Sequence, residues 1–289
     1  MKKETKPKKR RNNWTQWFIW TLQFTLDEYE DKIQFLPEYE LFSKPPRIDV
    51  VIIKLLEDIV IENTVGKFFN RHNIIEFKGP KDTLNIEAFN KVIGYSFFYI
   101  SQNNISVKDA AISFVSVKYP KKLISFLKKE KIYEIIPSNE SGIYYILPRS
   151  KDNAQTPKMQ LVVSSELSAQ DVLWLEMLRD DLSAQGFNKC LELYENTEKY
   201  KEQVEEILRG LLVVNNETLE KEGIMTATEK KFNEIVARWA VRTGAAQTWE
   251  QQGKQEGMQQ GIQQGMQQIF AFLKSGHTLE EAEKKFSFA

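Results

Sequence analysis

Cysteine and histidine are scarce in this chain. Its 289 residues include one cysteine, Cys190, and two histidines, His72 and His277. A single cysteine excludes an internal disulfide and a cysteine-rich zinc site, and the two distant histidines complete no zinc site either. We interpret Cys190 as a helix-packing residue and His72, which follows Arg71, as polar surface. Thiol and zinc chemistry are therefore not expected.

A net charge is also lacking, because 40 lysine and arginine residues balance 40 aspartate and glutamate residues. A net charge of zero does not indicate which kind of partner the protein binds, and a neutral chain can still contain a basic DNA-binding surface. Long apolar runs are absent as well, since no segment approaches the roughly 18 uninterrupted apolar residues of a membrane span. With 42% hydrophobic and 28% charged residues, the composition is typical of a globular protein. We expect a cytoplasmic protein without a membrane partner.

The N-terminal segment has a basic run, MKKETKPKKRR, before an aromatic run, WTQWFIWTLQF. A secretory signal begins in a similar way, but here no small-residue cleavage site follows and the acidic sequence DEYED comes next. The spacing of the aromatic residues predicts a buried helix over residues 13–26. Residues 1–12 are then expected to form a disordered basic tail.

Residues 13–150 show the pattern of a sheet with helices packed on it. Strands are predicted for IQFLPEYEL, RIDVVIIKLL, NIIEFK and AISFVSVKYP, with EDIVIEN as the return arm of one hairpin and YEIIPSNESGIYYIL as a second hairpin. Helices are predicted for NIEAFNKVIGYSFFYI, capped by Asp82 or Asn85, and for KKLISFLKKEK. The first of these helices has an apolar stripe formed by Ile86, Phe89, Ile93, Phe97 and Ile100. The predicted fold class is α/β or α+β, with a mixed sheet flanked by helices.

A polar, proline-containing linker at residues 149–158 leads into a region, 151–245, whose pattern is mainly helical. Its amphipathic candidates are LSAQDVLWLEMLRDDL, YKEQVEEILRGLLVV and ATEKKFNEIVARWAV. The last segment, 246–289, contains EQQGKQEGMQQGIQQGMQQ, with a glycine at every fourth residue. Each glycine costs a helix about 1 kcal/mol relative to alanine, so a flexible low-complexity tail and a helix packed on a partner helix both remain open. An apolar line at helical spacing favours self-association as a homodimer.

The segment HNIIEFKGP carries two charges on an otherwise apolar strand. Side chains alternate along a strand, so Glu76 and Lys78 share one face while Ile75 and Phe77 share the other. A structural ion pair at a strand end would explain the two charges. Asp49, in RIDVVIIK, places a further carboxylate on a second apolar strand. Two acids that converge at one sheet edge suit Mg²⁺, and a lysine beside them can orient a water and stabilise charge on phosphorus.

This arrangement resembles the PD-(D/E)XK nuclease superfamily. The strings KPPRIDVVIIK and NTVGKFFNRHNIIEFKGPKDTLNIEAFNKVIGYSFFY, with the glycine-spaced tail, are similar to its recombination-promoting nuclease and transposase-like branch. The resemblance extends from about residue 30 to 150. It implies a restriction-endonuclease-like fold and an endonuclease that hydrolyses DNA phosphodiester bonds with Mg²⁺ or Mn²⁺. A link to DNA recombination or mobile elements is implied as well.

Carried over residue by residue, the resemblance assigns Asp49 and Glu76 as metal ligands, with the backbone carbonyl of Phe77 as a further ligand. Lys78 would position the attacking water. Residue 48 is isoleucine, so the literal proline–aspartate pair of the superfamily is absent, although two prolines lie close by.

The superfamily often supplies a further acid from its first helix. This chain has Gln23 at the expected position, with Asp27 and Glu28 just beyond it. Without that acid, metal binding would be weakened. An alternative function therefore stays open, that of a catalytically impaired, nuclease-derived protein that binds DNA or supports an assembly.

Three further polar residues are candidates for contact with the DNA backbone. Lys91 and Tyr95 are one turn apart on the helix after the motif, away from its apolar stripe, and Lys81 follows the Gly79-Pro80 break. Solvated surface is the alternative interpretation of each.

Overall fold

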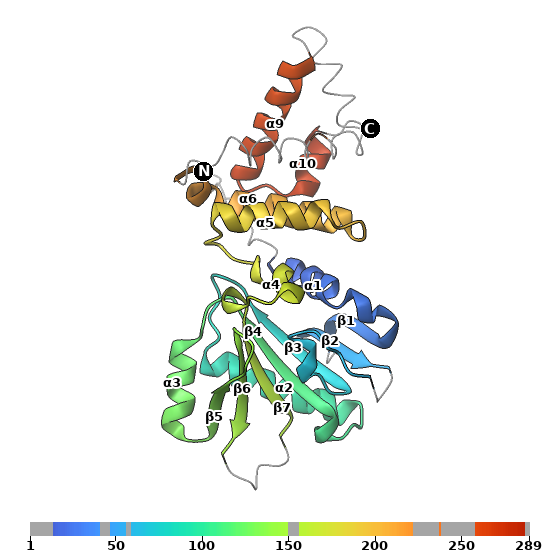
Figure 1. Cartoon of the computed structure of the whole chain (residues 1–289), viewed down its shortest axis with the longest axis vertical. Helices are drawn as coiled ribbons and strands as arrows, with labels where there is room; N and C mark the ends of the chain where they lie inside the picture. The colour runs from blue at the N-terminus through green and yellow to red at the C-terminus, as the bar shows by residue number, and fades with distance from the viewer. Residues whose placement is uncertain are drawn as a thin grey trace, which may run out of the picture. The chain divides into compact units, whose positions relative to one another are not determined.

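The structure is a computed structural model that describes residues 14–40, 47–55, 59–149, 156–221, 237 and 258–286. The chain divides into two compact units. One unit runs from Asn13 to Asp180 and contains the sheet, and the other is formed mainly by the residues from Asp181 onward. Figure 1 shows the elements of both units.

Within the described residues, the first unit is built on one mixed sheet with the strand order β1-β2-β3-β4-β7-β6-β5. The pairs β3–β4 and β4–β7 are parallel, and the other neighbours are antiparallel. The strands are β1 Ile33–Glu40, β2 Arg47–Lys54, β3 His72–Lys78, β4 Ala110–Ser116, β5 Tyr133–Pro137, β6 Ile143–Pro148 and β7 Lys158–Val163. The prediction of a mixed sheet flanked by helices is confirmed.

One face of the sheet is covered by helix α1, Trp14–Thr25. The ring of Phe18 in this helix stacks on the ring of Phe77 in β3, with centroids 4.3 Å apart. The short helix α4, Leu173–Glu176, packs against α1. The buried aromatic helix predicted near the N-terminus is therefore confirmed, and it lies on the Phe77 side of β3.

The other face is covered by α2, Ile86–Gln102, and α3, Lys121–Glu130. Both helices contribute to one apolar cluster, in which Phe89 of α2 stacks on Phe114 of β4 with centroids 4.8 Å apart. The side chain of Asn85 caps α2 by accepting a hydrogen bond from the Ala88 amide, as one of the two predicted caps requires. Figure 1 shows α3 beside β5.

The predicted return arm EDIVIEN is wrong. Residues 59–65 form no strand, and β2 pairs with β3 instead. The reason lies in Asn63, whose Oδ1 accepts hydrogen bonds from the amides of Val65 and Gly66 at 3.0 and 3.2 Å. The Nδ2 of the same side chain donates to the carbonyl of Asp171, and the Asp171 carboxylate accepts from the Thr64 amide and hydroxyl. These bonds satisfy the backbone without a strand partner.

Asn63→Ala is expected to lower the free energy of unfolding by about 3 kcal/mol, because a buried side chain with four hydrogen bonds is lost and its partners stay buried. Urea unfolding of the full chain measures the change. Asn139→Ala, at an exposed hairpin tip, is the control and should stay within about 0.5 kcal/mol of the parent protein. Equal effects of the two substitutions would contradict this account of Asn63.

Two other expectations differ from the structure. Phe97, predicted in the apolar stripe of α2, is 37% exposed, and the neighbouring face with Val92, Ser96 and Tyr99 is buried instead. The segment after residue 150 also does not leave the sheet: β7 inserts between β4 and β6, so the first unit extends to Asp180. β7 is short, its sequence KMQLVV contains Lys158 and Gln160, and it follows a polar segment that has the composition of a linker.

The described part of the second unit is helical, as predicted. Its elements are α5 Ala184–Glu195, α6 Lys201–Lys221, α9 Met258–Lys274 and α10 Leu279–Phe286. Much of the glycine repeat is therefore helix, and Met266 and Ile269 of its apolar line are buried. Self-association through this region stays a prediction. The tail 1–12 and the candidate ATEKKFNEIVARWAV lie essentially outside the described residues, among which no helix is long and apolar enough to cross a membrane.

Candidate functional site

Asp49 lies where the β2–β3 ladder ends. The backbone pairing of these strands stops at Val50 and Ile75. Beyond this last pair, the amide of Phe77 donates a hydrogen bond of 2.8 Å to Oδ2 of Asp49. The carboxylate is therefore held between the ends of β2 and β3.

Glu76 lies close enough to Asp49 for its negative charge to raise the pKa of the Asp49 carboxyl group. Oε1 of Glu76 accepts a hydrogen bond of 2.6 Å from Nζ of Lys78, which lies two residues further along the same strand. Phe114 is level with Glu76 in the parallel register and belongs to the cluster under α2. Glu76 and Lys78 thus face the α2 side, while Phe77 faces α1, as the alternation predicted.

The pKa of Asp49 is strongly raised. Burial is the largest cause and the negative charge of Glu76 the second, and the pKa of Asp49 is raised from 3.8 to about 7. The hydrogen bond from the Phe77 amide and the charge of Lys78 oppose the increase in pKa without cancelling it. One ammonium group therefore does not neutralise both acids, and the site attracts either a proton or another cation.

Lys78 remains an ammonium group at neutral pH. Burial lowers its pKa, but the charge and hydrogen bond of Glu76, with the charges of Asp49 and Asp82, outweigh that effect, so the pKa is raised above 10.5. A lysine in this state donates hydrogen bonds and provides positive charge. It cannot accept a proton, which excludes a general-base role for Lys78 in this form.

The carbonyl of Phe77 points to the same side as its amide, because the N–H and C=O groups of one strand residue face the same neighbouring strand. Since the amide donates to Asp49, the carbonyl is also directed toward the β2 side. The structure thus brings together Asp49, Glu76, Lys78 and this carbonyl, the group that the sequence singled out.

The first-helix position is not brought to this group. α1 lies on the Phe77 side of β3, opposite the side that Glu76 faces. Gln23 belongs to α1, and Glu28 is exposed in the 3₁₀ turn Asp27–Lys32 that follows. Among the described residues, neither hydrogen-bonds with Asp49 or with the pair that follows it in β3.

Two acids near the site were missed by the sequence reasoning. Glu38 of β1 is opposite Asp49, between the paired residues on either side, and its charge contributes to the raised pKa of Asp49. It has a positive φ of 48°, which is uncommon for a residue other than glycine. Asp82 acts on the pKa of Lys78. The acid within the apolar run IQFLPEYE was the signal available for Glu38.

The DNA-contact candidates occupy two places. Lys91 and Tyr95 are neighbours on α2, with Nζ of Lys91 at 5.6 Å from the centre of the Tyr95 ring. Tyr95 packs against the cluster that contains Ile48, the residue before Asp49. Lys81 is exposed in the turn that follows β3. All three lie on elements adjacent to the site.

The interpretation of His72 as polar surface is wrong. It opens β3, is buried, and its Nδ1 lies 2.9 Å from the hydroxyl of Tyr99. Burial lowers its pKa, and the nearby charge of Arg71 adds to that effect, so the imidazole is neutral at pH 7. Cys190 is buried in α5 and donates to the carbonyl of Gly186, in agreement with a packing role.

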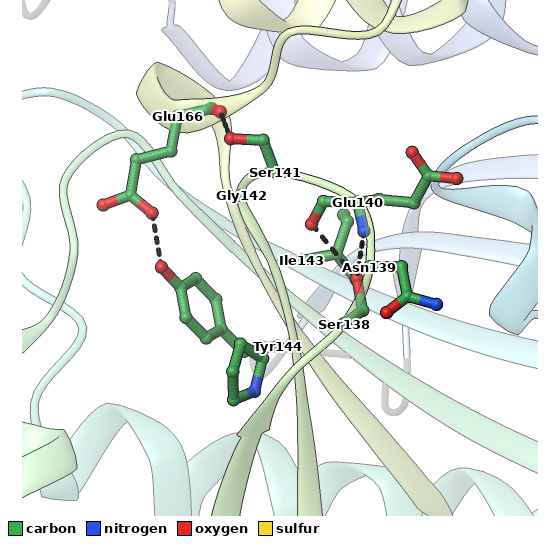
Figure 2. Close-up of a pocket in the computed structure, with 9 residues that line it drawn as sticks. Ser138, Asn139, Glu140, Ser141, Gly142, Ile143, Tyr144 and Glu166 are labelled. Atoms are coloured by element: carbon green, nitrogen blue, oxygen red, sulfur yellow. Dashed lines mark hydrogen bonds between the residues drawn. The ribbon is translucent and has the colours of Figure 1, made fainter.

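A hollow lies beside the β5–β6 hairpin, away from Asp49 and Glu76. Its polar groups bond to one another: the Tyr144 hydroxyl donates to the Glu166 carboxylate, and the Ser141 hydroxyl donates to the Glu166 carbonyl, as Figure 2 shows. Ser138 and Glu140 are also joined to each other there. Because these groups satisfy each other within the turn, we interpret the hollow as structural.

A cation fits the donor set of Asp49 and Glu76. Among the described residues, no three histidine, cysteine, aspartate or glutamate side chains are grouped as metal ligands. Mg²⁺ needs fewer, since it commonly takes one or two carboxylates and completes its shell with water and phosphate oxygens. The excess negative charge that raises the pKa of Asp49 is the kind of site that such an ion relieves.

Comparison with protein-family models, curated proteins and solved structures finds no match. The fold and the site together define a mixed α/β protein with two carboxylates and a lysine at the end of two adjacent strands.

Proposed function

We propose that this protein is a metal-dependent DNA endonuclease with a restriction-endonuclease-like core. The observation that carries the proposal is the second carboxylate. A structural ion pair is complete with Glu76 and Lys78 alone, whereas Asp49 adds a buried negative charge at a cost that the pair does not require. A costly excess of charge at the ends of two neighbouring strands is typical of a functional site.

In this proposal each residue has a distinct task. Asp49 and Glu76 would hold the metal ion, and the Phe77 carbonyl, on the same side of β3 as the amide that Asp49 accepts, would be a further ligand. The ion, when bound, supplies positive charge against the phosphate oxygens and makes a water more acidic. Lys78 donates a hydrogen bond to the attacking water and offsets the charge that develops on the phosphate. The Phe77 amide keeps the Asp49 carboxylate in place.

Supercoiled plasmid incubated with Mg²⁺ or Mn²⁺ is expected to be nicked, and EDTA is expected to prevent the reaction. Agarose gels that separate supercoiled, open-circular and linear DNA measure the outcome. Glu76→Gln is the matched variant, because it keeps the shape of the side chain and removes the charge needed for a metal ligand. Nicking that persists in EDTA, or that Glu76→Gln leaves unchanged, would contradict the proposal.

A second function is supported by the position of the first helix. Since α1 brings no acid to the site, a nuclease-derived protein that binds DNA or supports an assembly without cutting remains the alternative. Duplex binding without any metal-dependent nicking would favour it.

A further inference from the structure

A lysine-rich helix, α3, begins at the same end of the sheet as the candidate site and packs beside β5, three strands away from β4. α3 follows β4, and the amide of Val117, just after β4, donates to the carbonyl of Lys78 over 3.2 Å. Ser116, the last residue of β4, is level with Lys78 in the parallel register. α3 also packs in the cluster that contains Phe114, so it lies on the face of the sheet that Glu76 and Lys78 share.

The solvent side of α3 is basic. Leu123, Ile124 and Leu127 are buried under the helix. The exposed positions are Lys121, Lys122, Ser125, Phe126, Lys128, Lys129 and Glu130, so one acid stands among four lysines. In a chain whose charges balance overall, this is a local concentration of positive charge. We call these four lysines the lysine face.

The four lysines are available to an external partner. Within the part of the chain that the structure describes, none of them forms an ion pair or a side-chain hydrogen bond. From Lys121 to Lys129 the helix rises about 12 Å at 1.5 Å per residue. A DNA strand presents a phosphate every 3.4 Å or so along the axis, so roughly three or four phosphates span the same length.

The arrangement favours nucleic acid over a lipid surface. A helix that binds a membrane inserts its apolar side between the lipids. The apolar side of α3 is not free to do so, because Leu123 and Leu127 are buried in the core of the sheet domain. Lysine side chains on a rigid helix can instead neutralise phosphates while the helix stays packed.

We propose that the lysine face of α3 binds the phosphate backbone of a DNA duplex and holds it against the site formed by Asp49, Glu76 and Lys78. The identity of the polyanion rests on the proposed function, whereas the binding surface itself rests on the charge and position of α3. The lysines would contact phosphate groups and not the edges of the bases, so binding should not depend on the DNA sequence.

The test compares two double variants with the same loss of charge. Lys122→Gln with Lys129→Gln removes two of the four lysines, seven residues and therefore two helical turns apart on the same side of α3. Lys108→Gln with Lys189→Gln removes two exposed lysines elsewhere, one before β4 and one on α5. Glutamine is a good helix former, so both proteins should fold, which thermal unfolding verifies.

Binding of a fluorescently labelled DNA duplex is measured by anisotropy in EDTA over a range of salt concentrations, so that no cleavage interferes. The α3 variant should bind about tenfold more weakly at 0.1 M salt, and its slope of log K against log salt should be smaller by about 1.8. The other variant should match the parent protein. Phosphatidylserine vesicles are tested in parallel as a second polyanionic surface.

Each result decides between the proposals. If the α3 variant keeps the parent affinity and slope, or if both variants weaken binding equally, the lysine face is not the binding surface, even where the parent protein nicks plasmid. If the parent protein binds vesicles and no duplex, the proposal that α3 binds DNA is wrong. If the α3 variant alone is weakened and no plasmid is nicked with Mg²⁺, the surface is supported and the nuclease function is rejected.

Discussion

Lys78→Ala is expected to lower the rate of Mg²⁺-dependent plasmid nicking by on the order of 10²- to 10³-fold. The substitution removes the ammonium group that Glu76 holds at 2.6 Å, and with it the donor that faces the attacking water and the phosphate. It also leaves both acids without their positive neighbour. Initial rates on supercoiled plasmid, at saturating Mg²⁺ and equal protein concentration, measure the effect.

Lys108→Ala is the matched control for this experiment. It removes the same charge from an exposed side chain in the 3₁₀ turn Val107–Asp109, before β4. We expect less than a threefold change in rate, since an exposed charge acts through screened electrostatics alone. Metal-dependent nicking that survives Lys78→Ala unchanged, or that falls equally with Lys108→Ala, would reject the role given to Lys78.

Asp49→Asn is expected to stabilise the metal-free protein by about 2 kcal/mol at pH 8. In the folded protein the pKa of Asp49 is raised from 3.8 to about 7, so the charged carboxylate is unfavourable there. The amide of asparagine removes that charge and retains an oxygen that accepts the hydrogen bond from the Phe77 amide. The substitution that disables metal binding should therefore improve folding.

The sign of the pH dependence follows from proton uptake. Between pH 3.8 and about 7 the folded state binds more protons at Asp49 than the unfolded state does, so stability decreases as the pH rises through this window. Above pH 7 the full cost is present, and near pH 4 it is absent. The advantage of Asp49→Asn should accordingly be largest at pH 8 and small at pH 4.

Urea unfolding in EDTA at pH 4, 6 and 8 measures this dependence, with Asp31→Asn as the control at an exposed acid. Addition of Mg²⁺ at pH 8 should then raise the stability of the parent protein and leave Asp49→Asn unchanged, because only the former retains the ligand. A stabilising effect that is equal at all pH values, or that Asp31→Asn reproduces, would contradict this explanation.

These two variants separate the site from its alternatives. A purely structural ion pair predicts that Lys78→Ala lowers stability with no activity to lose, and it gives no reason for Mg²⁺ to stabilise the protein. An impaired nuclease predicts duplex binding without nicking. The lysine face of α3 is independent of both outcomes, since it is measured by binding in EDTA.

The sequence by itself determined the local elements and the pattern of the central strand. The alternation in HNIIEFKGP correctly placed Glu76 and Lys78 on one face and Phe77 on the other, because side-chain direction in a strand repeats every second residue. Helical spacing correctly identified α1, α2 and α3 for the same reason, since these periodicities depend on neighbours in the chain.

Tertiary structure alone decided which strands meet and what happens at their ends. The ladder of β2 and β3 ends so that the Asp49 carboxylate receives the Phe77 amide, and β1 brings Glu38 opposite Asp49. Where a strand was predicted, hydrogen bonds of Asn63 hold a turn instead, and β7 lies between β4 and β6 in the sheet. Strand register and long-range hydrogen bonds join residues far apart in the chain, so no local periodicity records them.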